Sequence, residues 1–198
     1  MFVKKNAVNI LLVFAIIFLS YRFLEKDRAG QTDWVSYRTE VRGAYKALAD
    51  KFVGMKFPGL HFRNAFTDST MNCSFQGIHI VAVLSSMGCN PCQLRELRNL
   101  DSLRNTLKNE VKFAALFVQE GKLEAMVIRK AAGVNIDIFY ASDTLAAQFN
   151  SSSKYPIVLL IDNQVIRRCY FPISVDEEYS RTRLSGFEDY VERSLSRR

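Results

Sequence analysis

Two cysteines stand three positions apart in the run Cys89-Asn90-Pro91-Cys92, a spacing that could support thiol–disulfide chemistry. Apolar residues before the run favour a strand and the residues after it favour a helix, so Cys89 is predicted at a helix N-terminus. Free backbone N–H groups and the helix dipole stabilise a thiolate at such a position. Cys92 would lie one turn away and could attack a mixed disulfide formed at Cys89. Pro91 is compatible with the first helical turn, and Gly88 leaves the Cys89 sulfur unshielded.

A zinc half-site is the alternative interpretation of this cysteine pair. A structural zinc ion usually needs a second pair of ligands, but Cys73 and Cys169 are isolated and both His61 and His79 precede the pair. Redox chemistry is therefore the favoured interpretation. We expect no metal, and no cofactor other than the Cys89–Cys92 disulfide itself.

The two remaining cysteines allow two interpretations. Cys169 lies in a predicted strand with Val165 and Phe171 on the same side, which favours an inert buried thiol that packs as a small apolar residue. A second disulfide between Cys73 and Cys169 is the alternative.

The segments around the cysteine pair alternate between short apolar runs and amphipathic stretches. Strands are predicted at Ile78–Ser85, Val111–Val118, Val134–Tyr140, Ile157–Ile161 and Val165–Phe171, and helices at Asn90–Asn109, Lys122–Ala132 and Asp143–Phe149. The last two strands flank Asp162-Asn163-Gln164, which favours a hairpin. Strands alternating with helices predict an α/β fold with a central mixed sheet flanked by helices.

Helix boundaries follow from capping signals. Gly133 is a typical residue to end the helix Lys122–Ala132. Ser174 and Glu177 form a capping box that would open a last helix, whose apolar residues face the sheet. Those apolar residues are Leu184, Phe187, Val191 and Leu195. In the helix after the cysteines, one side carries Leu94, Leu97, Leu100, Leu103 and Leu107.

The N-terminal segment carries a targeting signal. Lys4 and Lys5 precede an apolar run from Ala7 to Leu19 that continues to Leu24. We expect an uncleaved transmembrane signal-anchor over residues 1–24, with the lysines in the cytoplasm. A cleaved signal peptide is the alternative, but neither of the cleavage positions considered carries small residues at both required places.

An amphipathic helix is predicted at Gln31–Gly54, either packed on the domain or lying against a membrane or partner. The predicted organisation is a transmembrane helix at 1–24, a helical linker at 25–56 and one domain at 57–198. The chain of 198 residues has a net charge of +7, partly from arginines near its C-terminus. Such arginines complement a helix dipole, so we expect no nucleic-acid partner.

The strand–Cys-x-Pro-Cys–helix unit, followed by Tyr155-Pro156 and the strand Ile157–Asp162, resembles the thioredoxin-like superfamily. It is most similar to the membrane-anchored bacterial branch that serves cytochrome c maturation and periplasmic thiol reduction. The resemblance implies a thioredoxin-like fold, a cis peptide at Pro156, and a groove at Tyr155 and Pro156 that binds substrate. It also implies an insertion at Asp137–Asn150, before the cis-proline.

The sequence departs from this family pattern around the cysteines. Gly88 stands where an aromatic residue often precedes the first cysteine, and Tyr155 stands where thioredoxins commonly have Thr. Val83 and Leu84 occupy strand positions where relatives bury a carboxylate. Because that carboxylate assists proton transfer to the second cysteine, a differently tuned exchange reaction is predicted.

The predicted function is a thiol–disulfide oxidoreductase that acts on protein disulfides outside the cytoplasm, with Cys89 attacking and Cys92 resolving. Pro91 after Asn90 favours a reducing role. The expected partners are proteins with thiols or disulfides, a membrane electron-transfer thiol protein and the bacterial inner membrane, with the domain on the periplasmic side. The alternatives are a peroxide-reducing redoxin, a copper-binding module and a non-catalytic scaffold. The redoxin alternative is weakened because Ala82 stands where that family has proline. The copper alternative is weakened because no histidine ligand follows Cys89.

Overall fold

The computed structural model describes Ser20 and residues 35–57, 61–72, 75–107, 111–118, 121–141, 155–173 and 176–196. The chain divides into two compact units, Met1–Gly43 and Ala44–Arg198. In the first unit, Ser20 and residues 35–43 are helical. The predicted membrane-spanning segment 1–24 lies outside the described residues apart from Ser20. Within the part of the chain that the structure describes, no helix is long and apolar enough to cross a bilayer.

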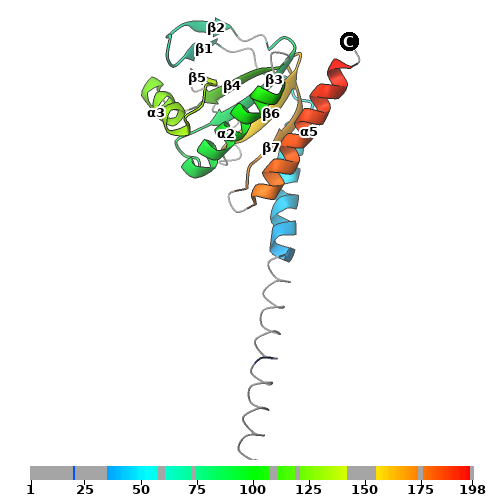
Figure 1. Cartoon of the computed structure of the whole chain (residues 1–198). Coiled ribbons are helices and arrows are strands. Elements are labelled where there is room, and N and C mark those ends of the chain that lie inside the picture. Colours follow the sequence, from blue (N-terminus) through cyan, green and yellow to red (C-terminus); the bar gives the residue numbers. More distant parts are fainter. Residues whose placement is uncertain are drawn as a thin grey trace, which may run out of the picture. The chain divides into compact units, whose positions relative to one another are not determined.

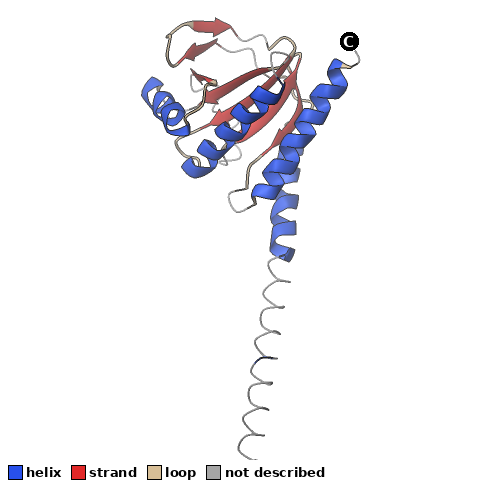
Figure 2. Ribbon diagram, viewed as in Figure 1, coloured by secondary structure: helices blue, strands red, loops and turns tan. Residues whose placement is uncertain are grey.

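Among the described residues of the second unit, a seven-stranded mixed sheet forms the centre of the fold (Figures 1 and 2). Its strand order is β2-β1-β5-β4-β3-β6-β7. The strands are β1 (His61–Asn64), β2 (Thr70–Asn72), β3 (Ile78–Leu84), β4 (Lys112–Phe117), β5 (Asp137–Ala141), β6 (Ile157–Asp162) and β7 (Val165–Tyr170). The predicted mixed sheet is confirmed, and the β1–β2 pair adds an edge that the sequence did not indicate.

Strand β3 lies inside the sheet and is paired on both sides. It runs parallel to β4, with Ala82 opposite Ala115, and antiparallel to β6, with Ala82 opposite Val158. All of its residues are buried, which explains the continuous apolar run. Alternate side chains of β3 point to opposite faces of the sheet, so Ile80 lies in one hydrophobic core and Val81 in the other.

Helices α2 (Asn90–Leu107), α3 (Lys122–Ala132) and α5 (Glu177–Leu195) pack on one face of the sheet. The apolar residues predicted to face the sheet do so. Those that are buried are Leu97, Leu100, Leu103 and Leu107 of α2 and Leu184, Phe187 and Val191 of α5, while Leu94 and Leu195 are partly buried. The helix predicted at Asp143–Phe149 and most of the predicted insertion lie outside the described residues.

The other face of the sheet is covered from residue 44 onward, inside the segment predicted as a linker. Residues 44–50 are helical, and Ala49 and Phe52 are buried in the second core. The ring of Tyr45 meets Phe171 edge-on at 6.3 Å, and Phe52 lies 6.0 Å from the same ring. Aromatic packing therefore ties this helical segment to the sheet.

Two local predictions are confirmed in detail. Asn163 and Gln164 have φ angles of 49° and 68°, as the tight turn of the β6–β7 hairpin requires. Gly133 ends α3 with a φ of 68°, and its N–H donates to the carbonyl oxygens of Arg129 and Lys130.

The start of α5 differs from the predicted capping box. The N-cap is Asp176, whose carboxylate accepts the backbone N–H of Tyr179 at 3.2 Å. Glu177 is therefore the first residue of the helix and not the third, so it cannot serve as the reciprocal partner of Ser174. An aspartate at the N-cap satisfies one of the free N–H groups and also complements the dipole.

Replacing Asp176 by alanine should lower the free energy of unfolding by about 1 kcal/mol, because the Tyr179 N–H loses its acceptor. Urea unfolding followed by circular dichroism measures the loss. Ser174→Ala is the comparison and should leave the unfolding midpoint unchanged. A larger loss of unfolding free energy for Ser174→Ala than for Asp176→Ala would show that Ser174 is the N-cap.

Candidate functional site

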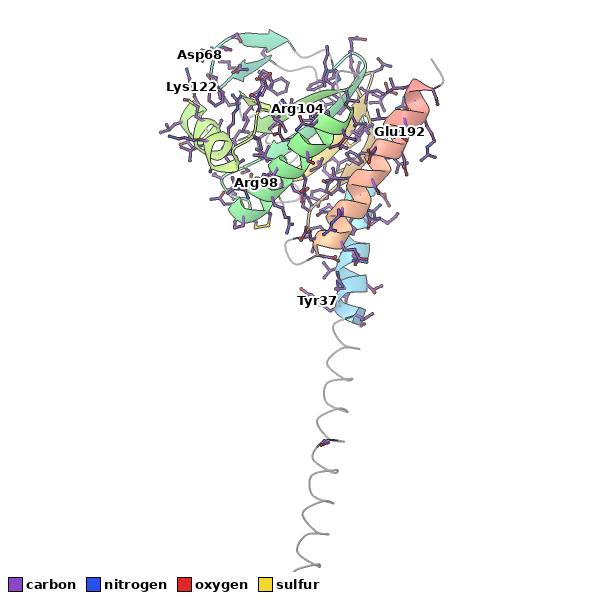
Figure 3. All side chains as sticks on the ribbon, viewed as in Figure 1. Tyr37, Asp68, Arg98, Arg104, Lys122 and Glu192 are labelled. Atoms are coloured by element: carbon purple, nitrogen blue, oxygen red, sulfur yellow. A yellow bond between two sulfur atoms is a disulfide. The ribbon has the colours of Figure 1, made fainter. Side chains whose placement is uncertain are left out.

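The two cysteines of the motif lie where strand β3 gives way to helix α2. β3 ends at Leu84, a short turn follows, and α2 begins at Asn90 directly after Cys89. The sulfurs of Cys89 and Cys92 form a disulfide with an S–S distance of 2.10 Å and a Cα–Cα distance of 5.2 Å. Figure 3 draws the described side chains on the ribbon, with Arg98 and Arg104 labelled along α2. The predicted placement of the pair at a helix N-terminus is confirmed.

The two sulfurs differ in accessibility. Cys89 is exposed, whereas Cys92 is only 5% exposed. The backbone N–H of Cys92 points at the Cys89 sulfur, 3.3 Å away. After reduction of the disulfide, this donor and the helix dipole would stabilise a Cys89 thiolate. A partner molecule can therefore contact Cys89. Cys92 is buried and contacts the Cys89 sulfur within the motif.

The turn before the cysteines is held by the side chain of Gln93, which the sequence did not single out. Its amide makes two hydrogen bonds with the backbone of Ser85: Oε1 accepts the Ser85 N–H at 2.9 Å, and Nε2 donates to the Ser85 carbonyl at 2.9 Å. Gln93 is fully buried. Because both ends of the amide are satisfied, the residue that follows β3 and the first turn of α2 are fixed to each other.

Gly88 is required by a close approach of two chain segments. A Cβ atom at this position would lie 2.8 Å from the Cβ of Tyr155, 3.0 Å from the Gln93 amide nitrogen and 3.1 Å from the Ser85 carbonyl. Any side chain would therefore force the reactive turn away from the segment before β6. Gly88 therefore allows the reactive turn to pack closely against the segment before β6. This role adds to the predicted one, which was to leave the neighbouring sulfur unshielded.

Tyr155 and Pro156 lie directly before β6, beside the turn that carries Cys89. The peptide bond between them is cis, as predicted. Both residues are buried, and burial raises the pKa of Tyr155. The structure thus brings all four predicted site residues together at one end of the sheet.

A buried carboxylate does exist near the site, although it comes from the helix and not from β3. Val83 and Leu84 are fully buried apolar residues, as expected, but Glu96 of α2 is also fully buried. The hydroxyl of Tyr170 donates to its Oε2 at 2.9 Å, and Arg95 Nε lies 3.5 Å from its Oε1. Burial and the neighbouring Glu96 charge raise the pKa of Tyr170 well above its usual value.

Glu96 follows Cys92 by four positions, so the two side chains share one face of α2. No feature of the sequence indicates this arrangement, because glutamates within helices usually face solvent. A buried acidic group on the inward face of the helix can influence proton transfer at the buried cysteine.

Among the described residues, the remaining candidate ligands do not form a second site. Cys169 is a buried free thiol, as predicted, and burial raises its pKa far above the ordinary value, so it is unreactive. Cys73, the other cysteine of the alternative disulfide, lies outside the described residues. Within the described ranges, no group of three or more His, Cys, Asp and Glu side chains could hold a metal ion.

The comparisons with known proteins are structural. No protein-family model matches the sequence, and no curated protein matches it. The structure is similar to a secreted Mycobacterium tuberculosis disulfide oxidoreductase homologous to E. coli DsbE. The TM-score is 0.52 and the identity 12%, covering 65% of this chain and 93% of that one. The thioredoxin domain of a Bacteroides vulgatus thiol-disulfide oxidoreductase gives a TM-score of 0.52 at 14% identity, covering 70% and 97%.

A thiol:disulfide interchange protein from Bacteroides sp. gives a TM-score of 0.51 at 12% identity, covering 66% and 87%. These neighbours are thioredoxin-like proteins of thiol–disulfide exchange. The chain therefore has the predicted thioredoxin-like fold, with a Cys-x-x-Cys disulfide at the start of its helix α2.

Replacing Gly88 by alanine should lower the free energy of unfolding by about 1–3 kcal/mol, because the new Cβ overlaps the Cβ of Tyr155. Denaturant unfolding of the oxidised protein measures the loss. The matched control is Gly186→Ala in α5, where the nearest atom would be Arg168 Nη1 at 3.8 Å. This second change should stabilise the helix by roughly 0.5–1 kcal/mol. Equal effects of the two substitutions would show that the approach to Tyr155 is unimportant.

Replacing Tyr170 by phenylalanine should lower the free energy of unfolding by about 1.5–3 kcal/mol, because the buried Glu96 carboxylate loses its donor. The control is Tyr190→Phe, which removes a half-buried hydroxyl bonded to Asp162 at 3.2 Å and should cost less. Thermal and urea unfolding measure both variants. A Tyr170→Phe protein as stable as the wild type would mean that the hydroxyl does not support Glu96.

Proposed function

We propose that the chain is a thiol–disulfide oxidoreductase in which Cys89 attacks and Cys92 resolves. The observation that carries this proposal is the disulfide across the first turn of α2, with one cysteine exposed and the other buried. The fold supports it, since the similar solved structures are thiol–disulfide exchange proteins. Tyr155 and Pro156 border the site and are proposed to bind the substrate backbone.

The reaction begins with the reduced pair. The Cys89 thiolate attacks one sulfur of a substrate disulfide, forms a mixed disulfide and releases the other substrate sulfur as a thiolate. Cys92 then loses its proton and attacks the Cys89 sulfur. This step forms the Cys89–Cys92 disulfide and releases the second substrate thiolate, so two electrons have passed to the substrate. Oxidation of a substrate dithiol is the same sequence in reverse, and the proposed reaction needs no other cofactor.

We further propose that the domain works outside the cytoplasm in the reducing direction. Support for the location comes from Lys4 and Lys5 before the apolar run of residues 7–19, which favours an inner-membrane anchor. Pro91 in the motif favours the reducing direction. The electron donor would be a membrane thiol protein, and the substrates would be proteins such as those of cytochrome c maturation.

The proposal predicts different outcomes for the two cysteines. Reduced wild-type protein should reduce a protein disulfide such as insulin, and Cys89→Ser should abolish that activity. Cys92→Ser should accumulate mixed disulfides through Cys89, visible on non-reducing gels, because the resolving thiol is missing. Cys169→Ala is the control and should retain activity, since that thiol is buried and unreactive.

Activity that survives Cys89→Ser would contradict the assignment of the attacking cysteine. Equilibration of the pair against glutathione buffers tests the direction separately. A reduction potential near about −120 mV, typical of strong oxidants, would refute the reducing role.

A further inference from the structure

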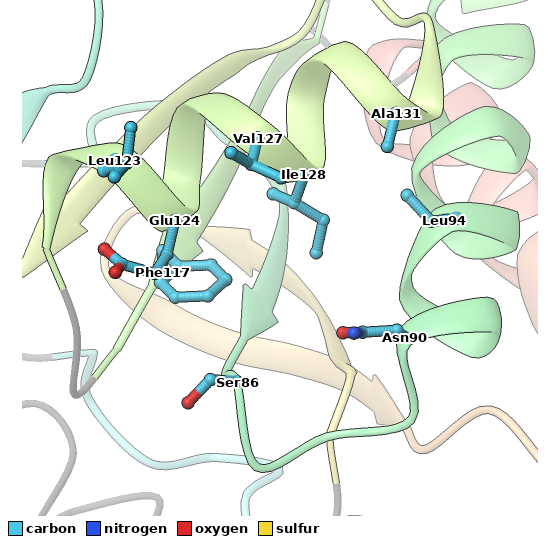
Figure 4. A pocket seen from close by; sticks show the side chains of 9 residues that line it. All are labelled: Ser86, Asn90, Leu94, Phe117, Leu123, Glu124, Val127, Ile128 and Ala131. Atoms are coloured by element: carbon cyan, nitrogen blue, oxygen red, sulfur yellow. The ribbon is translucent and has the colours of Figure 1, made fainter.

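A cavity of about 320 Å³ opens between helices α2 and α3, beside the cysteine pair. Its walls are mostly apolar: Leu94 from α2, Phe117 from the end of β4, and Val127 and Ile128 from α3 (Figure 4). This size lies at the low end for ligand-binding cavities, so it suits one or two side chains and not an extended molecule.

The cavity is continuous with the redox site. Asn90, which stands between the two cysteines, forms part of its lining, and Ser86 contributes from the turn before Cys89 (Figure 4). The cavity therefore adjoins the segment that carries Cys89, within reach of residues next to a sulfur bonded to Cys89. This proximity to the site of covalent attachment favours the polypeptide substrate as the occupant.

The rim of the cavity exposes large apolar side chains to solvent. Leu123 is 68% exposed and Val127 is 59% exposed, while Met87 in the turn before Cys89 is 71% exposed. Apolar side chains grouped beside a reactive centre typically mark a contact with a partner. Among the described residues of the lining, the charged one is Glu124, which disfavours acidic residues in the occupant.

The walls are held in place without an occupant. Arg98 of α2 donates from Nε to the Ala132 carbonyl at 3.1 Å and from a terminal nitrogen to the Ala131 carbonyl at 3.3 Å. These are carbonyls of the last turn of α3, which lack partners within the helix. Ala125 and Ile128 anchor α3 in the core. Binding to a preformed cavity costs little reorganisation.

We propose that the cavity between α2 and α3 receives one apolar side chain of the substrate polypeptide, close in sequence to the cysteine that reacts with Cys89. This inference rests on the proposed function and adds a substrate class: disulfides flanked by large apolar residues. Acidic flanking residues are disfavoured by Glu124, and small polar residues gain nothing from the apolar walls.

The test compares three disulfide-linked peptides that differ only beside the cysteine, where they carry Leu, Ser or Glu, with glutathione disulfide as a small reference. The reduced full chain should show a kcat/KM about ten- to a hundredfold higher for the Leu peptide than for the Ser peptide, and lowest for the Glu peptide. Val127→Asp and Ala131→Leu, both in the cavity lining, should each reduce the Leu preference about tenfold or more.

For each variant the preference is the ratio of kcat/KM for the Leu peptide to that for the Ser peptide, so a general change in the reactivity of the cysteine pair cancels. Val53→Asp is the matched control, since it places the same charge at an exposed valine outside the cavity lining. It should leave the preference for the Leu peptide unchanged.

Equal rates for the three peptides, with glutathione disulfide still reduced, would overturn the inference and leave the proposed function standing. A Leu preference that persists in both cavity variants would also overturn it. Loss of a dimer in Val127→Asp on gel filtration, with the preference intact, would assign the cavity to a second copy of this chain. Failure of the wild type to reduce any of the disulfides would overturn the function and the inference together.

Discussion

The reciprocal pairing of the Gln93 amide with the backbone of Ser85 is the interaction on which the reactive end of the molecule depends. It joins Ser85, the residue after strand β3, to the first turn of α2, and both cysteines lie within the segment between these two residues. Since the amide is fully buried, neither hydrogen bond competes with water. The pairing therefore holds together the two ends of the segment that carries the exposed Cys89 and the buried Cys92.

Elements with strong local signals could be predicted from the sequence. Two examples are helix α3, which is capped by Gly133, and the β6–β7 hairpin, whose turn contains Asn163 and Gln164. Both can be predicted because caps and turns depend on a few adjacent residues. The strand β3 was predicted because burial on both faces leaves a continuous apolar run.

Features that depend on contacts distant in sequence could not be predicted. The β1–β2 edge consists of short strands of mixed polarity, and only pairing with β5 defines it. In the site, the motif identified Cys89 and Cys92, but Gln93 and Glu96 look like ordinary polar residues of a helix surface. Their burial is decided by Ser85 and by Tyr170, a residue 74 positions away from Glu96. The N-cap was misplaced because Ser174 and Asp176 both suit that position, and sequence alone does not rank them.

Because Gly88 lies so close to Tyr155, position 88 must be glycine, whereas the side chain at position 155 can change. The atom of Tyr155 that limits the approach is Cβ, which every amino acid except glycine possesses. Position 155 can therefore exchange tyrosine for threonine or another residue without altering the backbone contact, whereas position 88 has no substitute. The residue before the cis-proline can thus vary independently of the turn that holds the cysteines, so one scaffold can present different side chains beside that turn.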